Sequence, residues 1–309
     1  MLFLIRILKS TIMEKINRRS FIYTGAVGLT GYAALTATGL ANMGFIPATA
    51  TIDKVKLGKT GLMVSRIALG TGSIGGNHQS NQTRLGMSKF VSMAHHAYDR
   101  GVHFFDTADS YGSYPFVREV FKEVPREKIT LLGKMWTEND PSKAEPADKA
   151  FDRFRTETGS DYFDIMLLHC MTNGNWQEEK KRYIDYFSKA KQEGKIKAVG
   201  VSCHNFEALK VAADDPWVDV ILARINPFRA HMDGSPAEIN AVLERARING
   251  KGIVGMKIFG NGDRVLETER EESITFALKK SSIHCMTLGM ESIAHVDDAV
   301  DRVMRIVKS

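Results

Sequence analysis

The chain has 309 residues, of which 43% are hydrophobic and 25% charged, with 26 Gly, 8 Pro and 3 Cys. This composition excludes a disordered, a collagen-like and a disulfide-stapled protein, and the length allows a sizeable core. The formal charge is +6, but residues 1–50 carry +4 of it and residues 51–309 only +2. A body so close to neutral gives little electrostatic reason to bind a phosphate backbone, so we expect no nucleic-acid partner. The sequence contains no Cys-x-x-Cys pair and no Cys/His cluster with zinc spacing, so no metal site is predicted.

The first fifty residues have the pattern of a targeting segment. Arg18 and Arg19 precede a weakly apolar stretch without charged residues, which ends in Ala48-Thr49-Ala50, a small-x-small site that signal peptidases accept. The segment resembles a twin-arginine export signal, with a possible start at Met13. Residues 1–50 are therefore predicted to be a signal peptide that is cleaved near Ala50, which implies the twin-arginine export machinery as a partner and a periplasmic location. The alternative is an uncleaved signal that anchors the protein in the membrane, for which frequent Gly is unfavourable.

Residues 51–309 alternate short apolar runs with longer amphipathic stretches, which is typical of parallel strands covered by helices. Their length matches a single (β/α)8 TIM barrel, so residues 51–309 are predicted to form one domain. Residues 53–65 alternate around Gly-Lys-Thr-Gly and predict a short N-terminal β-hairpin that closes the barrel floor. Helices are predicted near 86–100 and 292–307, among other intervals. The eight predicted strands are 66–70, 102–106, 129–134, 163–169, 196–202, 218–224, 252–257 and 283–288.

Three consecutive predicted strands end in a polar residue: Asp106, Lys134 and His169. Each lies on the same face of its strand as the alternate apolar residues, and Tyr111 follows Asp106 by five positions. In a (β/α)8 barrel the C-terminal ends of the strands carry the active site, so these residues indicate a catalytic rim. Taken singly, His169 could be a structural histidine and the Asp106–Lys134 pair a structural ion pair.

The motifs GVHFFDTADSYG, LLGKMW, MLLHC, KAVGVSCHN and GIVGMKIFGNG, in this order and spacing, resemble the aldo-keto reductase family from about Asp53 to the end of the chain. The resemblance implies that Asp106, Tyr111, Lys134 and His169 form the family's catalytic tetrad. It also implies reduction of an aldehyde or ketone, or the reverse oxidation, with NADP(H) or NAD(H). The alternative is a non-catalytic barrel that binds nucleotide and reports redox state as a sensor or regulatory subunit. An isomerase or lyase on the same barrel would carry a different acid–base set.

The chemistry of these residues agrees with the resemblance. A carbonyl oxygen that gains charge as hydride arrives needs a proton donor beside it. A phenol has a pKa of about 10, so we expect the Lys134 ammonium to lower the pKa of Tyr111 and Asp106 to keep Lys134 charged. His169 can then orient or polarise the carbonyl.

The resemblance also implies a set of cofactor-binding residues: Ser202, Arg224, Lys257, Gly260, Gly262, Gly289, Ser292, His295 and Asp298. Arg224 stands where the family usually has the Gln that holds the nicotinamide carboxamide. Glu291 stands where Lys or Arg commonly meets the adenosine 2′-phosphate, so weaker discrimination for NADP over NAD is expected.

Candidate walls of the substrate pocket are Trp136, Trp176 and Phe228, which lie at or after the ends of predicted strands. Cys170 and Cys203 end adjacent strands. Strand parity turns Cys170 away from the lumen, so the sequence favours two buried thiols over a redox pair.

Overall fold

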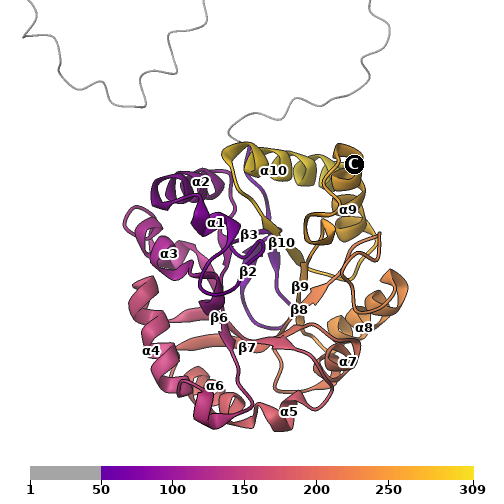
Figure 1. The fold of residues 1–309 in the computed structure, drawn as a ribbon. Helices are drawn as coiled ribbons and strands as arrows, with labels where there is room; N and C mark the ends of the chain where they lie inside the picture. The colour runs from indigo at the N-terminus through magenta and orange to yellow at the C-terminus, as the bar shows by residue number, and fades with distance from the viewer. Residues whose placement is uncertain (1–49) are drawn as a thin grey trace, which may run out of the picture. The chain divides into compact units, whose positions relative to one another are not determined.

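The computed structural model describes residues 50–309. In this part of the chain the predicted apolar runs form eight parallel strands, which close into one barrel in the order β10-β3-β4-β5-β6-β7-β8-β9. Helices surround the strands (Figure 1). The strands are β3 (Ile67–Gly70), β4 (Phe104–Asp106), β5 (Thr130–Trp136), β6 (Phe163–Met171), β7 (Ile196–Cys203), β8 (Val220–Arg224), β9 (Gly252–Met256) and β10 (Cys285–Gly289). The predicted (β/α)8 barrel is confirmed. The predicted signal peptide lies outside the described residues, except for Ala50.

The amphipathic stretches form the outer helices because each has one apolar stripe. The second helix buries Phe90, Met93, Ala94 and Ala97, which recur at helical spacing. The helices are α1 (Asn81–Arg84), α2 (Met87–Asp99), α3 (Tyr114–Val120), α4 (Ala147–Thr158), α5 (Trp176–Glu179), α6 (Lys181–Gln192), α7 (Phe206–Asp214), α8 (Pro236–Ile248), α9 (Glu267–Lys279) and α10 (Ile293–Lys308), with short 3-10 turns η1 (Asp109–Tyr111), η2 (Arg126–Lys128), η3 (Pro141–Lys143) and η4 (Gly260–Gly262). In the described part of the chain, no helix combines the length and apolarity that a membrane span requires.

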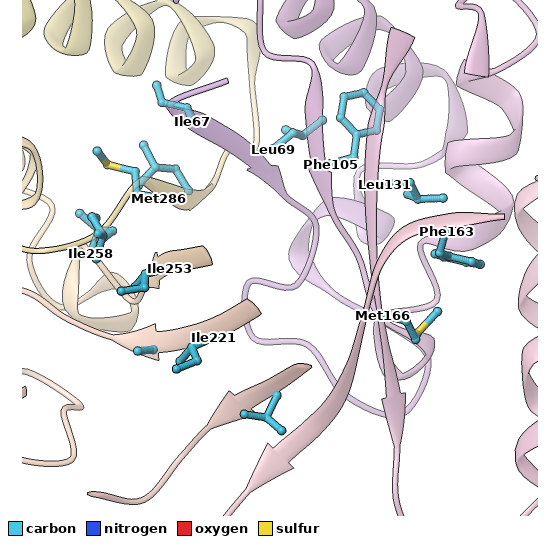
Figure 2. Packing of buried hydrophobic residues seen from close by; sticks show 14 of the residues in the cluster. Ile67, Leu69, Phe105, Leu131, Phe163, Met166, Ile221, Ile253, Ile258 and Met286 are labelled. Atoms are coloured by element: carbon cyan, nitrogen blue, oxygen red, sulfur yellow. The ribbon is translucent and has the colours of Figure 1, made fainter. Parts of the chain in front are cut away.

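Strand parity divides the core into two layers. Alternate side chains such as Leu69, Phe105 and Leu131 point outward and pack between the strands and the helices, as Figure 2 shows. The residues next to them in sequence, such as Phe104 and Leu132, fill the lumen of the barrel. Because side chains on a strand alternate between its two faces, this division also fixes which polar residues reach the lumen.

The predicted hairpin consists of β1 (Lys54–Lys56) and β2 (Met63–Ser65), which pair antiparallel. Leu57 and Val64 are fully buried and belong to the lumen cluster. Leu57 packs against the start of β9, since a Cβ atom on Gly252 would lie 2.6 Å from Leu57 Cγ. The hairpin therefore closes the end of the barrel at which the strands begin, the floor.

Candidate active site

Asp106, Lys134 and His169 meet at the C-terminal rim of the barrel, as predicted. They lie at or near the ends of β4, β5 and β6, and each has the parity of the residues that fill the lumen. All three side chains are buried, and Lys134 is only 1% exposed. The strand ends thus bring a carboxylate, an ammonium and an imidazole together in a site largely shielded from water.

Asp106 and Lys134 form a buried ion pair in which Lys134 Nζ donates to Asp106 Oδ1. Burial lowers the pKa of Lys134, and the Asp106 carboxylate opposes this shift by favouring the charged ammonium. The same ammonium lies over the face of the Tyr111 ring, 4.9 Å from its centroid. The pair therefore holds a positive charge next to the phenol.

Tyr111 ends the 3-10 turn η1, and close backbone approaches fix its position. Gly112 has a left-handed φ of 64°, and a Cβ there would lie 2.0 Å from the carbonyl oxygen of His78. A Cβ on Gly72 would lie 2.2 Å from Tyr111 Cε2, so the backbone after β3 lies directly against the phenol ring. Only glycine allows this contact, which holds Tyr111 against the rim.

His169 lies beside the phenol. Its Nε2 is 3.5 Å from the Tyr111 hydroxyl, and its ring meets Tyr111 and Trp136 edge-on, at centroid distances of 5.6 Å in each case. Burial, and to a lesser degree the Lys134 charge, lower the pKa of His169 well below its usual range. His169 is therefore neutral near pH 7, and its Nδ1 is buried with no hydrogen-bond partner among the described residues.

The pKa of Tyr111 differs from the sequence-based expectation. Burial raises it above the usual value for a phenol, and the Asp106 and Cys170 charges raise it further. The expected net lowering by Lys134 is not found, because burial is the largest cause of the shift and raises the pKa. Tyr111 is thus a neutral phenol that carries a proton at every ordinary pH.

The residues predicted to hold the nicotinamide end lie along the rim at β7 and β8. Ser202 is fully buried, and its Oγ accepts a hydrogen bond from the Cys170 backbone at 2.8 Å. Arg224 Nε donates to Asp233 Oδ2 at 2.9 Å, so its guanidinium is paired within the protein. Beside them, burial and the Arg224 charge lower the pKa of His204 to about 4.

The residues predicted for the phosphates and adenosine lie after β9 and β10. Lys257 Nζ donates to Asn261 Oδ1 at 3.3 Å, and Gly260 and Gly262 form η4. Gly289 ends β10, and Ser292 caps α10 by accepting a hydrogen bond from His295 N. The carboxylate of Asp298 is held by Arg270 and Arg302.

Glu291 has a contact that the sequence did not indicate. Its Oε1 accepts a hydrogen bond from Asn81 Nδ2 at 2.8 Å, across 210 positions of sequence. Arg84 Nη2 donates in turn to Asn81 Oδ1 at 2.6 Å. The acidic group after β10 is thus held by helix α1, which the hydrophobic pattern does not predict.

This rim fits a nicotinamide dinucleotide. Nδ1 of His169 and Nδ1 of His204 are buried without hydrogen-bond partners in the described part of the chain, so polar groups of a ligand could satisfy them. A Cβ added to Gly262 would have no atom within 4 Å among the described residues, so the loop after β9 leaves open space. The loops after the last two strands and a helix N-terminus are where barrels of this kind bind phosphate.

A cavity of about 230 Å³ opens beside His169, and we call it the Trp176 cavity. Two of the three candidate pocket residues, Trp136 and Trp176, line it, although Trp176 is almost completely buried. Phe228 does not line it and lies instead beneath the Arg264 guanidinium. Several further polar residues of the loops after β5 and β6 line this cavity, and no motif in the sequence pointed to them: Glu138, Glu179 and Lys180.

Cys170 lies on the side of the strand opposite to the one expected. The β6 register shifts between Leu168 and Met171, and Cys170 adopts a left-handed φ of 69°. This irregularity interrupts the alternation of side chains, so Cys170 lines the Trp176 cavity instead of packing outward. Parity fails here because it holds only while the strand stays regular. Cys203 is buried as expected, and both thiols are free.

Left-handed residues other than glycine cluster at this end of the barrel. In residues 50–309 they all lie at or after the ends of strands β3, β6, β8 and β9: Ile74, Asn77, His78, Cys170, Arg229, His231, Lys257 and Asn261. Such conformations are unfavourable for L residues and persist where the surroundings enforce them, often at functional sites.

Comparisons with known proteins agree with this geometry. The chain is 25% identical over 218 residues to the NADH-specific methylglyoxal reductase of Escherichia coli, covering 64% of this chain and 65% of the relative. It is 30% identical over 164 residues to a probable aldo-keto reductase 1 of Glycine max, covering 50% of this chain and 45% of the relative. The chain thus spans between about half and two thirds of the length of these two relatives. It is also 25% identical over 256 residues to the L-galactose dehydrogenase of Arabidopsis thaliana, with 77% and 76% covered.

Solved structures share the fold. A putative aldo-keto reductase from Pseudomonas aeruginosa superposes with a TM-score of 0.69 at 20% identity, over 84% of this chain and 98% of that chain. An aldo/keto reductase from Klebsiella pneumoniae, in complex with NADP and acetate, does so with a TM-score of 0.60 at 17% identity, over 82% and 90% of the two chains. Residues 66–303, which include all four residues of the rim tetrad, match the Aldo/keto reductase family. The chain therefore belongs to the aldo/keto reductase family.

Proposed function

We propose that the protein reduces an aldehyde or ketone to an alcohol, or catalyses the reverse oxidation, with Tyr111 as the general acid. The observation that carries this proposal is the half-buried Tyr111 side chain, whose hydroxyl keeps its proton and lies 3.5 Å from neutral His169. A buried ion pair places a positive charge over the same ring. These are the groups that a carbonyl reduction needs at the oxygen atom.

A nicotinamide cofactor, when bound, supplies or accepts the hydride. Residues of the chain donate and accept the proton. As the carbonyl carbon gains hydride, its oxygen gains negative charge, and Tyr111 transfers its hydroxyl proton to that oxygen. The phenolate that remains is stabilised by the Lys134 ammonium, which Asp106 keeps charged despite burial. Neutral His169 can donate a hydrogen bond from one nitrogen to the same oxygen and so orient the carbonyl.

We propose that the nicotinamide end lies near Ser202, Arg224 and His204, and the pyrophosphate over Lys257 and the loop Gly260–Gly262. Ser292, His295 and Gly289 would surround the adenosine end. Asp298 would have to loosen its bonds to Arg270 and Arg302 before it could contact the cofactor.

We also propose that NADP is discriminated from NAD more weakly than is usual in the family. Glu291 is held by Asn81, and a 2′-phosphate beside its carboxylate would be repelled. Arg84 and His295 are the nearby groups that could offset this repulsion, since Arg84 bonds Asn81 and His295 Nδ1 accepts from the Glu291 backbone at 3.3 Å.

The test is oxidation of NADH and NADPH, followed by ultraviolet absorbance, against a panel of aldehydes, ketones and quinones. Tyr111→Phe should lower kcat by roughly 10²–10⁴-fold and leave cofactor affinity unchanged, because it removes only the proton donor. Tyr114→Phe is the matched control, since Tyr114 lies in the same segment and packs against Phe154 and Phe163. Equal activity of wild type and Tyr111→Phe would refute the proposal. Nucleotide binding without turnover of any carbonyl would favour the redox sensor.

We further propose that residues 1–50 direct export, and that the protein leaves the cytoplasm folded around its cofactor. Free nicotinamide nucleotide is a cytoplasmic resource, so an exported reductase has to retain it, which needs nanomolar affinity or about −12 kcal/mol. Protein recovered from the periplasm should carry nucleotide through gel filtration, and the double variant Arg18→Lys, Arg19→Lys should stay in the cytoplasm. Nucleotide-free protein with micromolar affinity would contradict retention. A double variant that still reaches the periplasm would contradict the export signal.

A further inference from the structure

The size and lining of the Trp176 cavity indicate which substrates fit beside the tetrad. It lies beside His169 and is lined by Trp136, Glu138, Trp176, Glu179 and Lys180 among others. Its volume of about 230 Å³ is below the roughly 300–1,000 Å³ of pockets for drug-sized ligands. A carbonyl held at Tyr111 and His169 would therefore extend only a short chain of atoms into this space.

Trp176 offers the cavity an unused hydrogen-bond donor. Its side chain is 1% exposed, and its Nε1 is buried with no hydrogen-bond partner among residues 50–309. A buried donor left unpaired is unfavourable, and in native proteins such groups commonly await a water or a ligand. An acceptor oxygen on the substrate would satisfy it.

The charged groups around the cavity are acidic in balance. Glu179 accepts hydrogen bonds from Asn173 Nδ2 at 3.0 Å and 3.1 Å, and Glu138 accepts one from Trp136 Nε1 at 3.0 Å. Both carboxylates keep further acceptor positions, because a carboxylate can accept about four hydrogen bonds. The cavity thus presents acceptors for hydroxyl protons.

Lys180 offsets only part of this negative charge. It is the one lysine or arginine that lines the cavity in the described part of the chain, and it donates to the Thr137 carbonyl at 3.0 Å and to Asn139 Oδ1. A substrate carboxylate would meet two carboxylates and a single ammonium, so the net negative charge of the lining disfavours its binding.

We propose that the Trp176 cavity selects small, uncharged aldehydes with a hydroxyl group next to the carbonyl, and disfavours aldehydes that carry a carboxylate. This inference rests on the proposed reductase function. The substrate oxygen accepts from Trp176 Nε1, and its hydroxyl proton is donated to Glu138 or Glu179. Trp136, which is half exposed, covers the carbon atoms.

Three two-carbon aldehydes test this inference at constant size: glycolaldehyde, acetaldehyde and glyoxylate, compared at equal concentrations of the unhydrated aldehyde. We expect kcat/KM for glycolaldehyde to exceed that for glyoxylate by roughly tenfold or more, because one unfavourable charge contact is worth about that factor. The double variant Glu138→Gln, Glu179→Gln should reduce this ratio. An unchanged ratio, or glyoxylate as good a substrate as glycolaldehyde, would overturn the inference.

Trp176→Phe tests the donor separately, since it keeps a large ring and removes the N–H. It should raise KM for glycolaldehyde several-fold, with little change for acetaldehyde and in kcat. The matched control is Trp217→Phe, because Trp217 Nε1 donates to Ser188 Oγ at 3.0 Å and Trp217 does not line the cavity. An equal effect of both variants, or an equal effect on both aldehydes, would contradict the role of Trp176.

Binding measurements distinguish the inference about the cavity from the proposed reductase function. Each aldehyde is titrated against the intrinsic tryptophan fluorescence of wild type and of Trp176→Phe, with the Glu138→Gln, Glu179→Gln protein as a second variant should Trp176→Phe fail to fold. Selective binding of glycolaldehyde without reduction would support the cavity and contradict the reductase. Reduction of all three aldehydes with equal efficiency would support the reductase and contradict the selectivity of the cavity.

Discussion

The Lys134 ammonium lies over the face of the Tyr111 ring, 4.9 Å from its centroid, and donates its hydrogen bond to Asp106. In the resting protein the pKa of the phenol is nevertheless raised, because burial is the largest cause of its shift. When the phenol gives up its proton, the same cation meets a full negative charge in place of a neutral ring. In the proposed reaction this arrangement favours the state after proton transfer over the state before it, as general-acid catalysis by Tyr111 would require.

The contact between Gly72 and Tyr111 predicts a substitution that acts only through position. Gly72→Ala places a methyl group 2.2 Å from the ring, so Tyr111 must move. We expect kcat/KM to fall by roughly 10²-fold, the effect of a displacement of about 1 Å at a reacting group. Gly76→Ala is the control, because a Cβ there has no atom within 4 Å in the described part of the chain. An unchanged kcat/KM of Gly72→Ala in steady-state kinetics would show that activity does not depend on this position of the phenol.

The buried ion pair predicts a large loss of stability when one partner is removed. Lys134→Met leaves the Asp106 carboxylate buried without its cation, which should lower the free energy of unfolding by about 3–5 kcal/mol. Adding Asp106→Asn should recover part of this stability without restoring activity. Urea denaturation of the single and double variants measures both effects.

An exposed pair provides the comparison. Lys122 and Glu119 also form an ion pair, at 2.7 Å, but the Lys122 side chain is 64% exposed. Lys122→Met should therefore change the free energy of unfolding by less than about 1 kcal/mol. Equal losses at Lys134 and Lys122 would show that burial does not strengthen the dependence of Asp106 on Lys134.

Glu291 predicts a change in cofactor preference. Glu291→Arg exchanges a repulsive carboxylate for a charge-assisted hydrogen bond to a 2′-phosphate, so NADPH affinity should rise by roughly tenfold or more relative to NADH. Asn81→Ala, which releases the carboxylate, should have a smaller effect in the same direction. Calorimetric titration with both cofactors measures this, with Glu272→Arg on the exposed surface of α9 as the control for added charge. A strong native preference for NADPH with no gain in Glu291→Arg would argue against the idea.

His204 predicts how stability depends on pH. Its pKa in the folded state is about 4, against 6.5 for an unperturbed imidazole. The unfolded state then binds more protons between these values, so stability is complete above pH 6.5 and is lost as the pH falls toward 4. The expected contribution at pH 5 is a loss of about 2 kcal/mol in the free energy of unfolding. Thermal melts from pH 7.5 to 5 should decline less steeply in His204→Asn, whereas His78→Asn, an exposed histidine, should match wild type.

Elements with a strong hydrophobic period could be predicted closely. Helix α2 was expected at 86–100 and spans Met87–Asp99, and β4 was expected to end at Asp106, where it does. Asp106, Lys134 and His169 could be placed for the same reason, because regular strands carry parity to their ends, whereas Tyr111 lies in the turn η1 and was assigned through the family resemblance. Cys170 could not be predicted, since the irregularity in β6 depends on tertiary contacts that leave no mark on the alternation of residues.

Contacts between distant loops were equally beyond sequence reasoning. Asn81 and Glu291 are each ordinary polar residues, and only the closed barrel brings the loop after β3 against the loop after β10. The pKa of Tyr111 was mispredicted because the expected effect of Lys134 omitted burial, which is the largest cause of the shift.

The left-handed residues at the rim have a counterpart at the floor. There, turns such as those at Gly101 and Gly194 reach the same conformation with glycine, and a Cβ on Gly194 would have no atom within 4 Å among the described residues. Glycine adopts this conformation without steric cost and the Gly194 turn is open, whereas the rim segments hold it with larger residues, at the end of the barrel that carries Tyr111 and His169. New chain ends, peptide tags or inserted domains belong at the turn between α6 and β7, where the barrel can be reopened without disturbing the chemistry.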